Sequence, residues 1–171
     1  MAGCFVHRRH HGKQLPRLAG WWGNDPATRF RMHLEPEFVP VSSADAWQLS
    51  NPPILAAAPL RDSLALFDEA GMAALRDKSL ALTAYLHRLV AEVADRRLRL
   101  LTPDDPAARG CQTSIEVARD GRALFGAMRR CGVVGDFREP GVIRVAPVPL
   151  YNSFHDVWRF GRALAEWSTA R

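Results

Sequence analysis

Lysine is scarce in this chain of 171 residues, which has only Lys13 and Lys78 against 21 arginines. A lysine amine is the group through which some enzymes attach a cofactor covalently. Lys13 lies in a basic loop, and Lys78 lies on a predicted helix. The sequence therefore offers little for chemistry that depends on a lysine amine.

Cysteine is scarce as well, and the chain has only Cys4, Cys111 and Cys131. Their number is odd, and no Cys-x-x-Cys pair occurs. Both observations argue against a disulfide framework and against a zinc site. We expect reduced, partly buried thiols.

Several motifs of catalysis and metal binding are missing. The sequence has no Gly-rich phosphate loop, no Gly-x-Ser-x-Gly and no His-Glu-x-x-His. Three carboxylates stand alone, without a visible partner: Asp25, Asp45 and Asp156. The histidines of His-Arg-Arg-His-His, which are His7, His10 and His11, have arginine neighbours that would repel a cation. A solvated basic loop is favoured there over a metal site.

Long apolar runs are also absent. The longest, residues 54–60, is far shorter than the roughly 20 residues that a membrane helix needs, and Pro59 interrupts it. The first residues lack the apolar stretch and cleavage site of a signal peptide. We expect no membrane association and a cytoplasmic location.

The charge balance is basic, with a net charge of +5, and a basic balance can indicate a nucleic-acid partner. Here the arginines are scattered along the chain, and several lie beside acids in helical patterns. A nucleic-acid partner is therefore not expected, and a basic nucleic-acid binder is only a weak third interpretation. Hydrophobic residues make up 47% and charged residues 24%, as in ordinary globular proteins.

The first 50 residues are predicted to form loops and short strands, because proline and glycine recur throughout. Residues 3–6 resemble a buried strand that has lost its neighbours. Such a long irregular lead is unusual for a free-standing domain and suggests packing against something outside these residues. Pro52-Pro53 can begin a helix, Gly71 can interrupt it, and leucines at helical spacing continue it to about residues 96–99.

The remaining residues predict a small β-α-β-β-α arrangement. Residues 111–117 alternate as a half-buried strand, and Asp120 can cap a short helix that ends at Cys131-Gly132. Residues 133–134 and 142–145 are predicted strands that turn through residues 139–141. Ser153-x-x-Asp156 resembles a capping box that opens a last helix.

Three segments could line a small-molecule site, although each has a simpler interpretation. Arg144 ends a predicted strand before Pro-x-Pro and could clamp a carboxylate, or could be a surface arginine. Trp21-Trp22 could present an indole N–H to a phosphate, although core packing is favoured. Asn51 could place its amide against an anion at a helix start, although capping is favoured.

Together these segments resemble kynureninase, a pyridoxal-phosphate hydrolase of the aspartate-aminotransferase fold (fold type I). The matching stretches lie in the order of the family and span nearly the whole chain. They are residues 3–7 (Gly-Cys-Phe-Val-His), 18–23 (Leu-Ala-Gly-Trp-Trp-Gly), 28–30 (Thr-Arg-Phe), 50–54 (Ser-Asn-Pro-Pro-Ile), 109–112 (Arg-Gly-Cys-Gln) and 144–156 (Arg-Val-Ala-Pro-Val-Pro-Leu-Tyr-Asn-Ser-Phe-His-Asp).

The resemblance implies roles for single residues. Trp21 matches a tryptophan that reaches the cofactor phosphate from the neighbouring subunit. Asn51, in Ser-Asn-Pro-Pro with Ser50, matches a residue lining the cofactor phosphate and the substrate ring. Arg144 matches the arginine that holds the α-carboxylate of the substrate. The resemblance also implies a homodimer with sites between subunits, and hydrolysis of L-kynurenine or its 3-hydroxy form to an anthranilate and L-alanine.

Two departures from the family pattern bear on activity. Asn24 stands where the family often has a histidine near the aromatic end of the substrate, so Asn24 is expected to affect substrate preference. The cofactor lysine of the family lies shortly before the Gly-Cys-Phe-Val strand, and this sequence has no matching lysine there. Neither Lys13 nor Lys78 matches it.

These observations predict an α/β chain that is the C-terminal part of a fold type I enzyme. Residues 1–55 would be the end of the large domain, residues 56–100 linking helices, and residues 101–171 the small domain. The 171 residues alone are expected to be inactive, and to be poorly soluble or oligomeric through the exposed face of residues 1–55. The alternative is a non-catalytic dimerisation or assembly module, or one half of a split enzyme.

Overall fold

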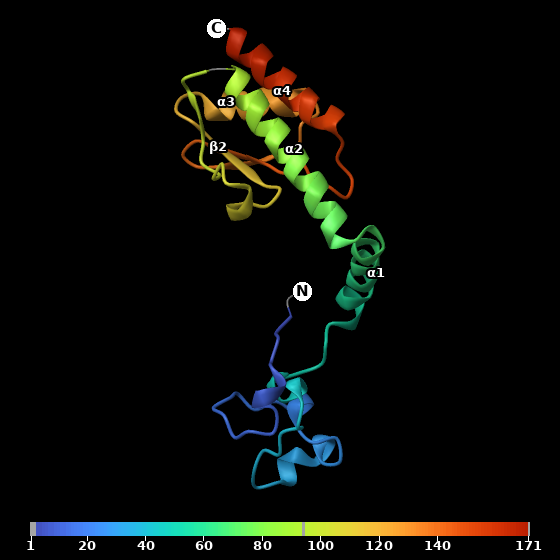
Figure 1. Cartoon of the computed structure of the whole chain (residues 1–171). Coiled ribbons are helices and arrows are strands. Elements are labelled where there is room, and N and C mark those ends of the chain that lie inside the picture. The colour runs from blue at the N-terminus through green and yellow to red at the C-terminus, as the bar shows by residue number, and fades with distance from the viewer. Residues whose placement is uncertain (1–2, 94, 171) are drawn as a thin grey trace. The chain divides into compact units, whose positions relative to one another are not determined.

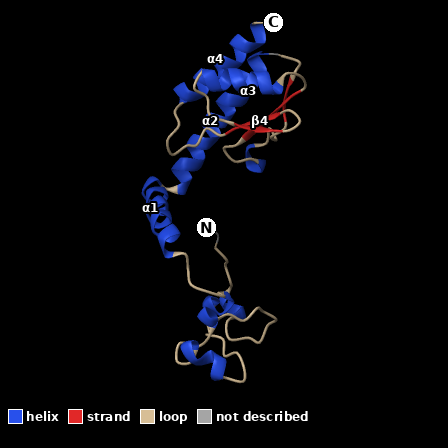
Figure 2. Cartoon of the chain, turned by 180° about the vertical axis from the view of Figure 1, so that it is seen from behind, coloured by secondary structure: helices blue, strands red, loops and turns tan. Residues whose placement is uncertain are grey.

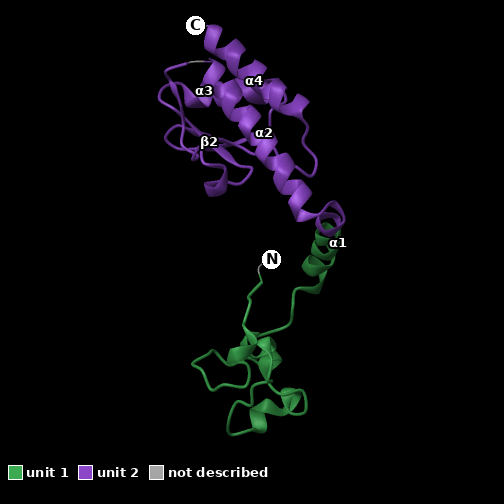
Figure 3. Cartoon of the chain, in the orientation of Figure 1, with its two compact units in different colours: residues 1–65 green, residues 66–171 purple. Residues whose placement is uncertain are grey.

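The computed structural model describes residues 3–93 and 95–170, and the chain forms two compact units. Residues 1–65 make up unit 1 and residues 66–171 make up unit 2 (Figure 3). The boundary falls inside helix α1, Ile54–Ala70. The division into three segments at residues 55 and 100 stays a prediction.

From residue 3 to the start of α1, unit 1 forms loops and four short 3₁₀-helices. The 3₁₀-helices are η1 (Arg8–His10), η2 (Trp21–Gly23), η3 (Arg29–Leu34) and η4 (Ala44–Trp47). The prediction of short strands was wrong: among the described residues of unit 1, extended backbone makes a single isolated bridge, between Asn24 and Pro40. A strand needs a partner for its N–H and C=O groups. Residues 3–6 have none among the described residues, and Phe5 is 88% exposed.

Two helices follow each other at Gly71. Helix α1 ends at Ala70, Gly71 takes a left-handed conformation (φ 76°), and α2 runs over Met72–Val93. Glycine adopts this conformation without the steric cost that a Cβ brings. The predicted interruption at Gly71 is therefore confirmed. The predicted end near residues 96–99 was wrong, because strand β1 (Leu98–Leu100) occupies that stretch.

Unit 2 is a four-stranded antiparallel sheet with helices on one face (Figures 1 and 2). Strands β2 (Thr113–Val117), β3 (Asp136–Arg138) and β4 (Val142–Val145) join β1 in the order β1-β2-β4-β3. Helices α3 (Gly121–Arg130) and α4 (Phe154–Thr169) complete the unit, together with the 3₁₀-helix η5 (Pro106–Ala108). This is the mixed α/β architecture expected of the fold class.

The core of unit 2 lies between the sheet and α2, α3 and α4. Inward-facing residues of β2 and β4 alternate with polar ones, as a sheet covered on one face requires. The core side chains are Leu82, Leu86, Val90, Ile115, Val117, Leu124, Met128, Ile143, Val145, Val157, Phe160, Leu164 and Trp167. Their burial fixes which face of β4 points outward.

Several local predictions in unit 2 are confirmed. Gly132 is left-handed (φ 78°) after α3, and residues 139–141 connect β3 to β4. Ser153 and Asp156 form a reciprocal capping box at the start of α4. Val133 and Val134, in contrast, do not form the predicted strand, which begins at Asp136. The strand begins at Asp136, and both Val133 before it and Phe137 within it pack against the core.

Among the described residues, no helix combines the length and the apolar character needed to cross a membrane.

Candidate functional site: an arginine on the outer face of the sheet

Arg144 lies on the face of the sheet opposite the helices, which we call the outer face. Its strand neighbours Ile143 and Val145 are buried in the core, so the alternation of β4 turns Arg144 outward. Its side chain keeps 31% of its surface exposed. The backbone register places Ser114 of β2 on one side of Arg144 and Asp136 of β3 on the other.

Asp136 is the ion-pair partner of Arg144. The Nε of Arg144 donates to Oδ2 of Asp136 at 3.0 Å, and one terminal nitrogen donates to the same oxygen. Arg138, two residues along β3, donates from its own Nε to that oxygen at 3.0 Å. The hydrogen bonds from Arg144, with the charges of both arginines, hold the pKa of Asp136 below its usual range.

This pairing uses only one edge of the Arg144 guanidinium. A guanidinium has five N–H groups in a planar fork, and Nε with its adjacent terminal nitrogen forms the edge that meets Asp136. The end of the fork uses other hydrogens: one N–H of the second terminal nitrogen, and the second N–H of the nitrogen that already donates to Asp136. A second carboxylate can therefore bind there through two parallel hydrogen bonds.

The outer face carries one further ion pair. Nε of Arg99 on β1 donates to Glu116 on β2 at 2.7 Å, and the two side chains keep 69% and 41% of their surface exposed. Exposed pairs of this kind are screened and contribute little to stability. This pair provides a comparison for the pair formed by Arg144.

Trp21 and Asn51 belong to unit 1, and their surroundings are those of that unit alone. Trp21 is half-buried, and the centroid of its ring lies 5.3 Å from that of Trp22, edge-on, and 5.6 Å from that of Phe30. Since Phe30 is itself 76% exposed, this is a surface cluster of aromatic rings and not the core packing that was favoured. A Cβ on Gly20 would lie only 2.2 Å from the Leu49 carbonyl oxygen. The backbones before Trp21 and before Ser50-Asn51 are therefore in direct contact, which brings these two predicted stretches together.

Ser50 and Asn51 are exposed at the surface of unit 1. The carbonyl of Pro53 accepts from the N–H groups of Ala56 and Ala57, so Pro53 and not Asn51 occupies the capping position of α1. The favoured capping interpretation of Asn51 was therefore wrong. Its amide makes no hydrogen bond within the described residues.

Asn24 is 1% exposed, and its side chain is used inside unit 1. Its Oδ1 accepts from the N–H of Val39 at 3.2 Å, and its Nδ2 donates to Thr28 Oγ1 at 2.8 Å. These bonds close the loop between η2 and Val39. A role of Asn24 in substrate preference stays a prediction.

Both lysines lie at exposed positions, Lys13 in the loop after η1 and Lys78 on α2. The expectation for the thiols was partly wrong, because Cys4 and Cys131 are exposed and only Cys111 is half-buried. In the basic loop, the His7 ring accepts from the N–H of Arg9. Within residues 3–93 and 95–170, no cluster of His, Cys, Asp and Glu is arranged to hold a metal ion.

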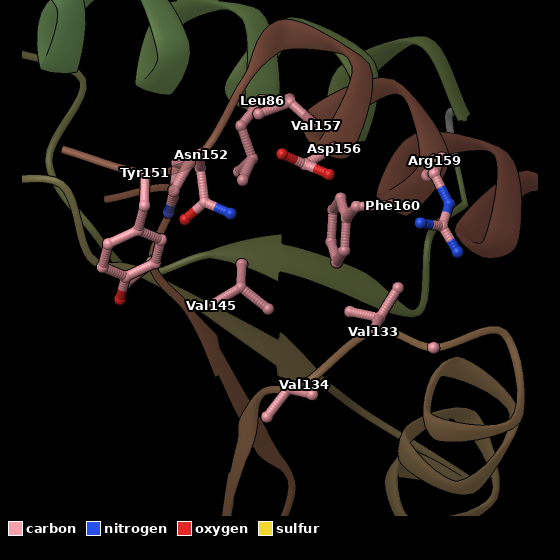
Figure 4. Close-up of a pocket in the computed structure, with 13 residues that line it drawn as sticks. Leu86, Val133, Val134, Val145, Tyr151, Asn152, Asp156, Val157, Arg159 and Phe160 are labelled. Carbon is pink, nitrogen blue, oxygen red and sulfur yellow. The ribbon is translucent and has the colours of Figure 1, made fainter. Parts of the chain in front are cut away.

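A cavity of about 430 Å³ lies on the other face of β4 from Arg144 (Figure 4). Its wall is mainly apolar, with Leu86, Val145 and Phe160 facing into it. Two polar side chains at this cavity have structural partners: Asp156 caps α4, and Oδ1 of Asn152 accepts from the N–H of Val148 at 2.9 Å. The cavity is thus separated from the arginine by the strand itself.

The fold and the outer face define a mixed α/β protein whose sheet presents an arginine suited to a carboxylate ligand. A family model described as "Kynureninase C-terminal domain" matches residues 75–164, which is more than half of the chain. The chain belongs to this family, as its motifs predicted.

Curated relatives support the assignment. The chain is 56% identical over 99% of its length to a kynureninase from Xanthomonas euvesicatoria pv. vesicatoria. It is 55% identical to a kynureninase from Xanthomonas axonopodis pv. citri and 54% identical to one from Xanthomonas oryzae pv. oryzae, over the same share of the chain. In each comparison the chain spans 40% of the length of the relative.

Proposed function

We propose that the chain forms the substrate-carboxylate part of a kynureninase. The reaction would be the hydrolysis of L-kynurenine or 3-hydroxy-L-kynurenine to an anthranilate and L-alanine, in tryptophan catabolism in the cytoplasm. The observation that carries the proposal is the free end of the Arg144 guanidinium on the outer face, within the segment that matches the family. A fixed fork of donors of this kind suits an α-carboxylate.

Unit 1 would contribute to binding pyridoxal 5'-phosphate. Trp21 offers an indole N–H, Asn51 an amide and Ser50 a hydroxyl, and none of these groups has a hydrogen bond within the described residues. Neutral donors gathered by the contact of Gly20 with Leu49 fit an anionic phosphate. When bound, the cofactor would supply the electron sink that the reaction needs.

The family pattern implies a homodimer with sites shared between subunits. In such a dimer, Trp21 would serve the neighbouring subunit, and Asn24 would affect substrate preference. Arg144 would bind and orient the α-carboxylate of the substrate. Asn51 and Ser50 would line the phosphate of the cofactor and the aromatic ring of the substrate.

The 171 residues by themselves should lack activity. Neither Lys13 nor Lys78 corresponds to the cofactor lysine of the family, and the chain spans 40% of the length of its relatives. Purified chain mixed with pyridoxal phosphate and dialysed should retain no visible absorption. Retained cofactor that maps to Lys13 or Lys78 after borohydride reduction would contradict this part of the proposal.

A chimera tests the function directly. The chain would replace the matching segment of the Xanthomonas euvesicatoria kynureninase, and hydrolysis of L-kynurenine would be measured. We expect activity within about tenfold of the parent, and roughly a 100-fold loss of kcat/KM for Arg144→Lys, since about 3 kcal/mol of charge-assisted bonding is lost. A folded, cofactor-loaded chimera without activity would overturn the proposal.

An assembly module is the second candidate. The observation in its favour is the apolar surface of α1, where Ile54, Leu55 and Leu64 are more than half exposed. A module of this kind would form dimers, or complement a separate chain, without binding L-kynurenine. Dimerisation together with an inactive chimera would favour it.

A further inference from the structure

We propose that Asp136 is a positioning residue: it holds the Arg144 guanidinium by its Nε edge and so presents the end of the fork to a ligand carboxylate. This inference rests on the proposed function, because it assumes that Arg144 receives a carboxylate. It assigns a role to a residue that no motif of the sequence had indicated.

The backbone fixes the pair. Asp136 and Arg144 are directly opposite each other in the antiparallel ladder of β3 and β4, at the short distance of cross-strand neighbours. One oxygen, Oδ2, takes both donors of the Nε edge. A guanidinium held along one edge has lost much of its rotational freedom, so less entropy remains to be lost when a ligand binds at the other end.

Charge balance supports the same role. Arg138 and Arg144 would repel each other across the two strands if no anion lay between them. Asp136 bonds to both, and the three side chains together carry one net positive charge. Because both arginines lower the pKa of Asp136, its carboxylate stays ionised throughout the neutral range. One positive charge is what a single carboxylate ligand neutralises.

A merely structural ion pair would behave differently. Arg144 and Asp136 keep 31% and 44% of their side-chain surface exposed, and exposed pairs contribute little to folding stability. Removing the charge of Asp136 should therefore hardly change the unfolding transition of the chain. The effect should fall on ligand binding at Arg144.

The opposite arrangement is also conceivable chemically: Asp136 could occupy the place of the ligand and leave when the ligand arrives. The two arrangements differ at Nε of Arg144. A positioning residue keeps its bond to Nε while the ligand is bound, whereas a competing residue loses it.

Nitrogen-15 NMR of the full 171-residue chain measures this bond. The arginine side-chain signals of Arg144 are assigned by their loss in Arg144→Lys, and the probe is L-alanine, with ethylamine as its carboxylate-free control. We expect L-alanine, but not ethylamine, to move the terminal-nitrogen signals of Arg144 while the Nε–H signal stays in place. Movement of Nε–H to its position in Asp136→Asn would overturn the proposal in favour of competition.

Matched variants complete the test. Asp136→Asn should weaken L-alanine binding by at least about tenfold, which corresponds to the loss of one charge-assisted contribution. Glu116→Gln removes a carboxylate from the other ion pair of the outer face and should leave binding unchanged. Equal affinity of Asp136→Asn and the unsubstituted chain would overturn the positioning role alone.

The chimera adds a kinetic readout. Asp136→Asn should raise KM for L-kynurenine about tenfold with a smaller change in kcat. The reason is that the variant weakens binding of the substrate carboxylate more than it slows the reaction of bound substrate. Asp136→Glu should recover part of the loss. If L-alanine moves no Arg144 signal in the unsubstituted chain, Arg144 is not a carboxylate site, and the proposed function fails together with the inference.

Discussion

At the scale of single residues, Asp95 joins two ends of unit 2. Its carboxylate accepts from Nε of Arg97 at 2.9 Å and from Oγ of Ser168 at 2.6 Å. The guanidinium of Arg97 in turn lies over the ring of Trp167, 4.1 Å from its centroid. The hydrogen bond from Arg97 is the main cause that holds the pKa of Asp95 far below its usual range.

Asp95→Asn should lower the free energy of unfolding by roughly 2 kcal/mol at neutral pH, because hydrogen bonds to a charged, nearly buried group are lost. A carboxyl with a depressed folded-state pKa stabilises the fold above its unfolded pKa of about 4, and this stabilisation is lost as the pH falls below it. Denaturant titrations between pH 2 and 7 should therefore show a flatter acid limb for the variant. Asp77→Asn, at an exposed position of α2, is the control, and its unfolding free energy should depend on pH as steeply as that of the unsubstituted chain.

His87 is a second buried ionisable residue, 8% exposed on α2. Its Nε2 lies 3.2 Å from Thr113 Oγ1, and its Nδ1 lies 3.2 Å from a terminal nitrogen of Arg109. Since the arginine can only donate, Nδ1 accepts, and the proton of the neutral ring is assigned to Nε2. Burial first, and then the charge of Arg109, lower the pKa of His87, and the smaller effect of Asp104 opposes them.

Stability should therefore fall as the pH drops below about 6.5, the ordinary pKa of histidine. Below that pH the unfolded chain binds a proton that the folded chain resists, so protonation favours unfolding. His87→Gln should reduce the difference in unfolding free energy between pH 7.5 and pH 5.5. The exposed His155→Gln should leave it unchanged, and a His87→Gln variant with an undiminished pH dependence would contradict the assignment.

At the scale of elements, α2 and α4 pack closely because Gly161 has no side chain. A Cβ at Gly161 would lie 2.7 Å from Cδ1 of Leu89 and 3.2 Å from its Cβ and Cγ. A Cβ at Gly126 of α3 would meet only Arg130, at an ordinary 3.5 Å. The two helical glycines thus differ in what surrounds them.

Gly161→Ala should destabilise unit 2 by about 1–2 kcal/mol, because overpacking against Leu89 exceeds the gain in helix propensity. Gly126→Ala should instead stabilise it by up to about 1 kcal/mol, since only the propensity changes. Thermal unfolding of the two variants measures both signs. Leu89→Ala in the Gly161→Ala background should cost less than Leu89→Ala alone, and equal costs would mean that the helices can separate freely.

Sequence patterns predicted the elements that have strong local signals. The capping box of Ser153, the left-handed Gly132 and the interruption at Gly71 were all found from residue types that suit one backbone conformation. Strand β1 was missed because it is three residues long and follows directly on a helical pattern. The short strands predicted for unit 1 were wrong because extended backbone becomes a strand only beside a partner, which local sequence does not reveal.

Arg144 was singled out from the predicted strand and from the family motif, and its role as a carboxylate site stays a prediction. Its place on the outer face and its pair with Asp136 were not predicted, because the neighbouring strand was placed at Val133-Val134. The sequence did contain a signal for this pair. If the turn is placed at residues 139–141, Arg138 pairs with Val142, and two residues further along each strand Asp136 pairs with Arg144. The buried amide of Asn24 depends on Val39, fifteen residues away, and no pattern indicated that bond.

At the scale of the whole molecule, the two units differ in how much apolar surface they bury. The hydrophobic core consists of residues of unit 2, from Leu82 to Trp167. In unit 1, large apolar side chains are exposed, including Phe5 at 88%, Leu18 at 77% and Phe30 at 76%. Extended apolar surface of this kind favours association.

Residues 72–171, which begin after the left-handed Gly71, should therefore fold cooperatively and remain monomeric, while the full chain associates. Light scattering coupled to size-exclusion chromatography measures the masses, and the main unfolding transition should have the same midpoint in both chains. A full chain that is monomeric at high concentration would contradict this prediction. A shorter chain that fails to unfold cooperatively would show that unit 2 needs unit 1.

The position of Asp136 between two arginines also bears on how the sequence can drift. If Arg138 is replaced first, Asp136 and Arg144 remain a neutral couple, and the change should be tolerated. If Asp136 is replaced first, two like charges are left side by side, and the arginine that we propose for the ligand is no longer held. Substitutions in this trio should therefore accumulate in one order, with Arg138 free to vary while Asp136 is retained.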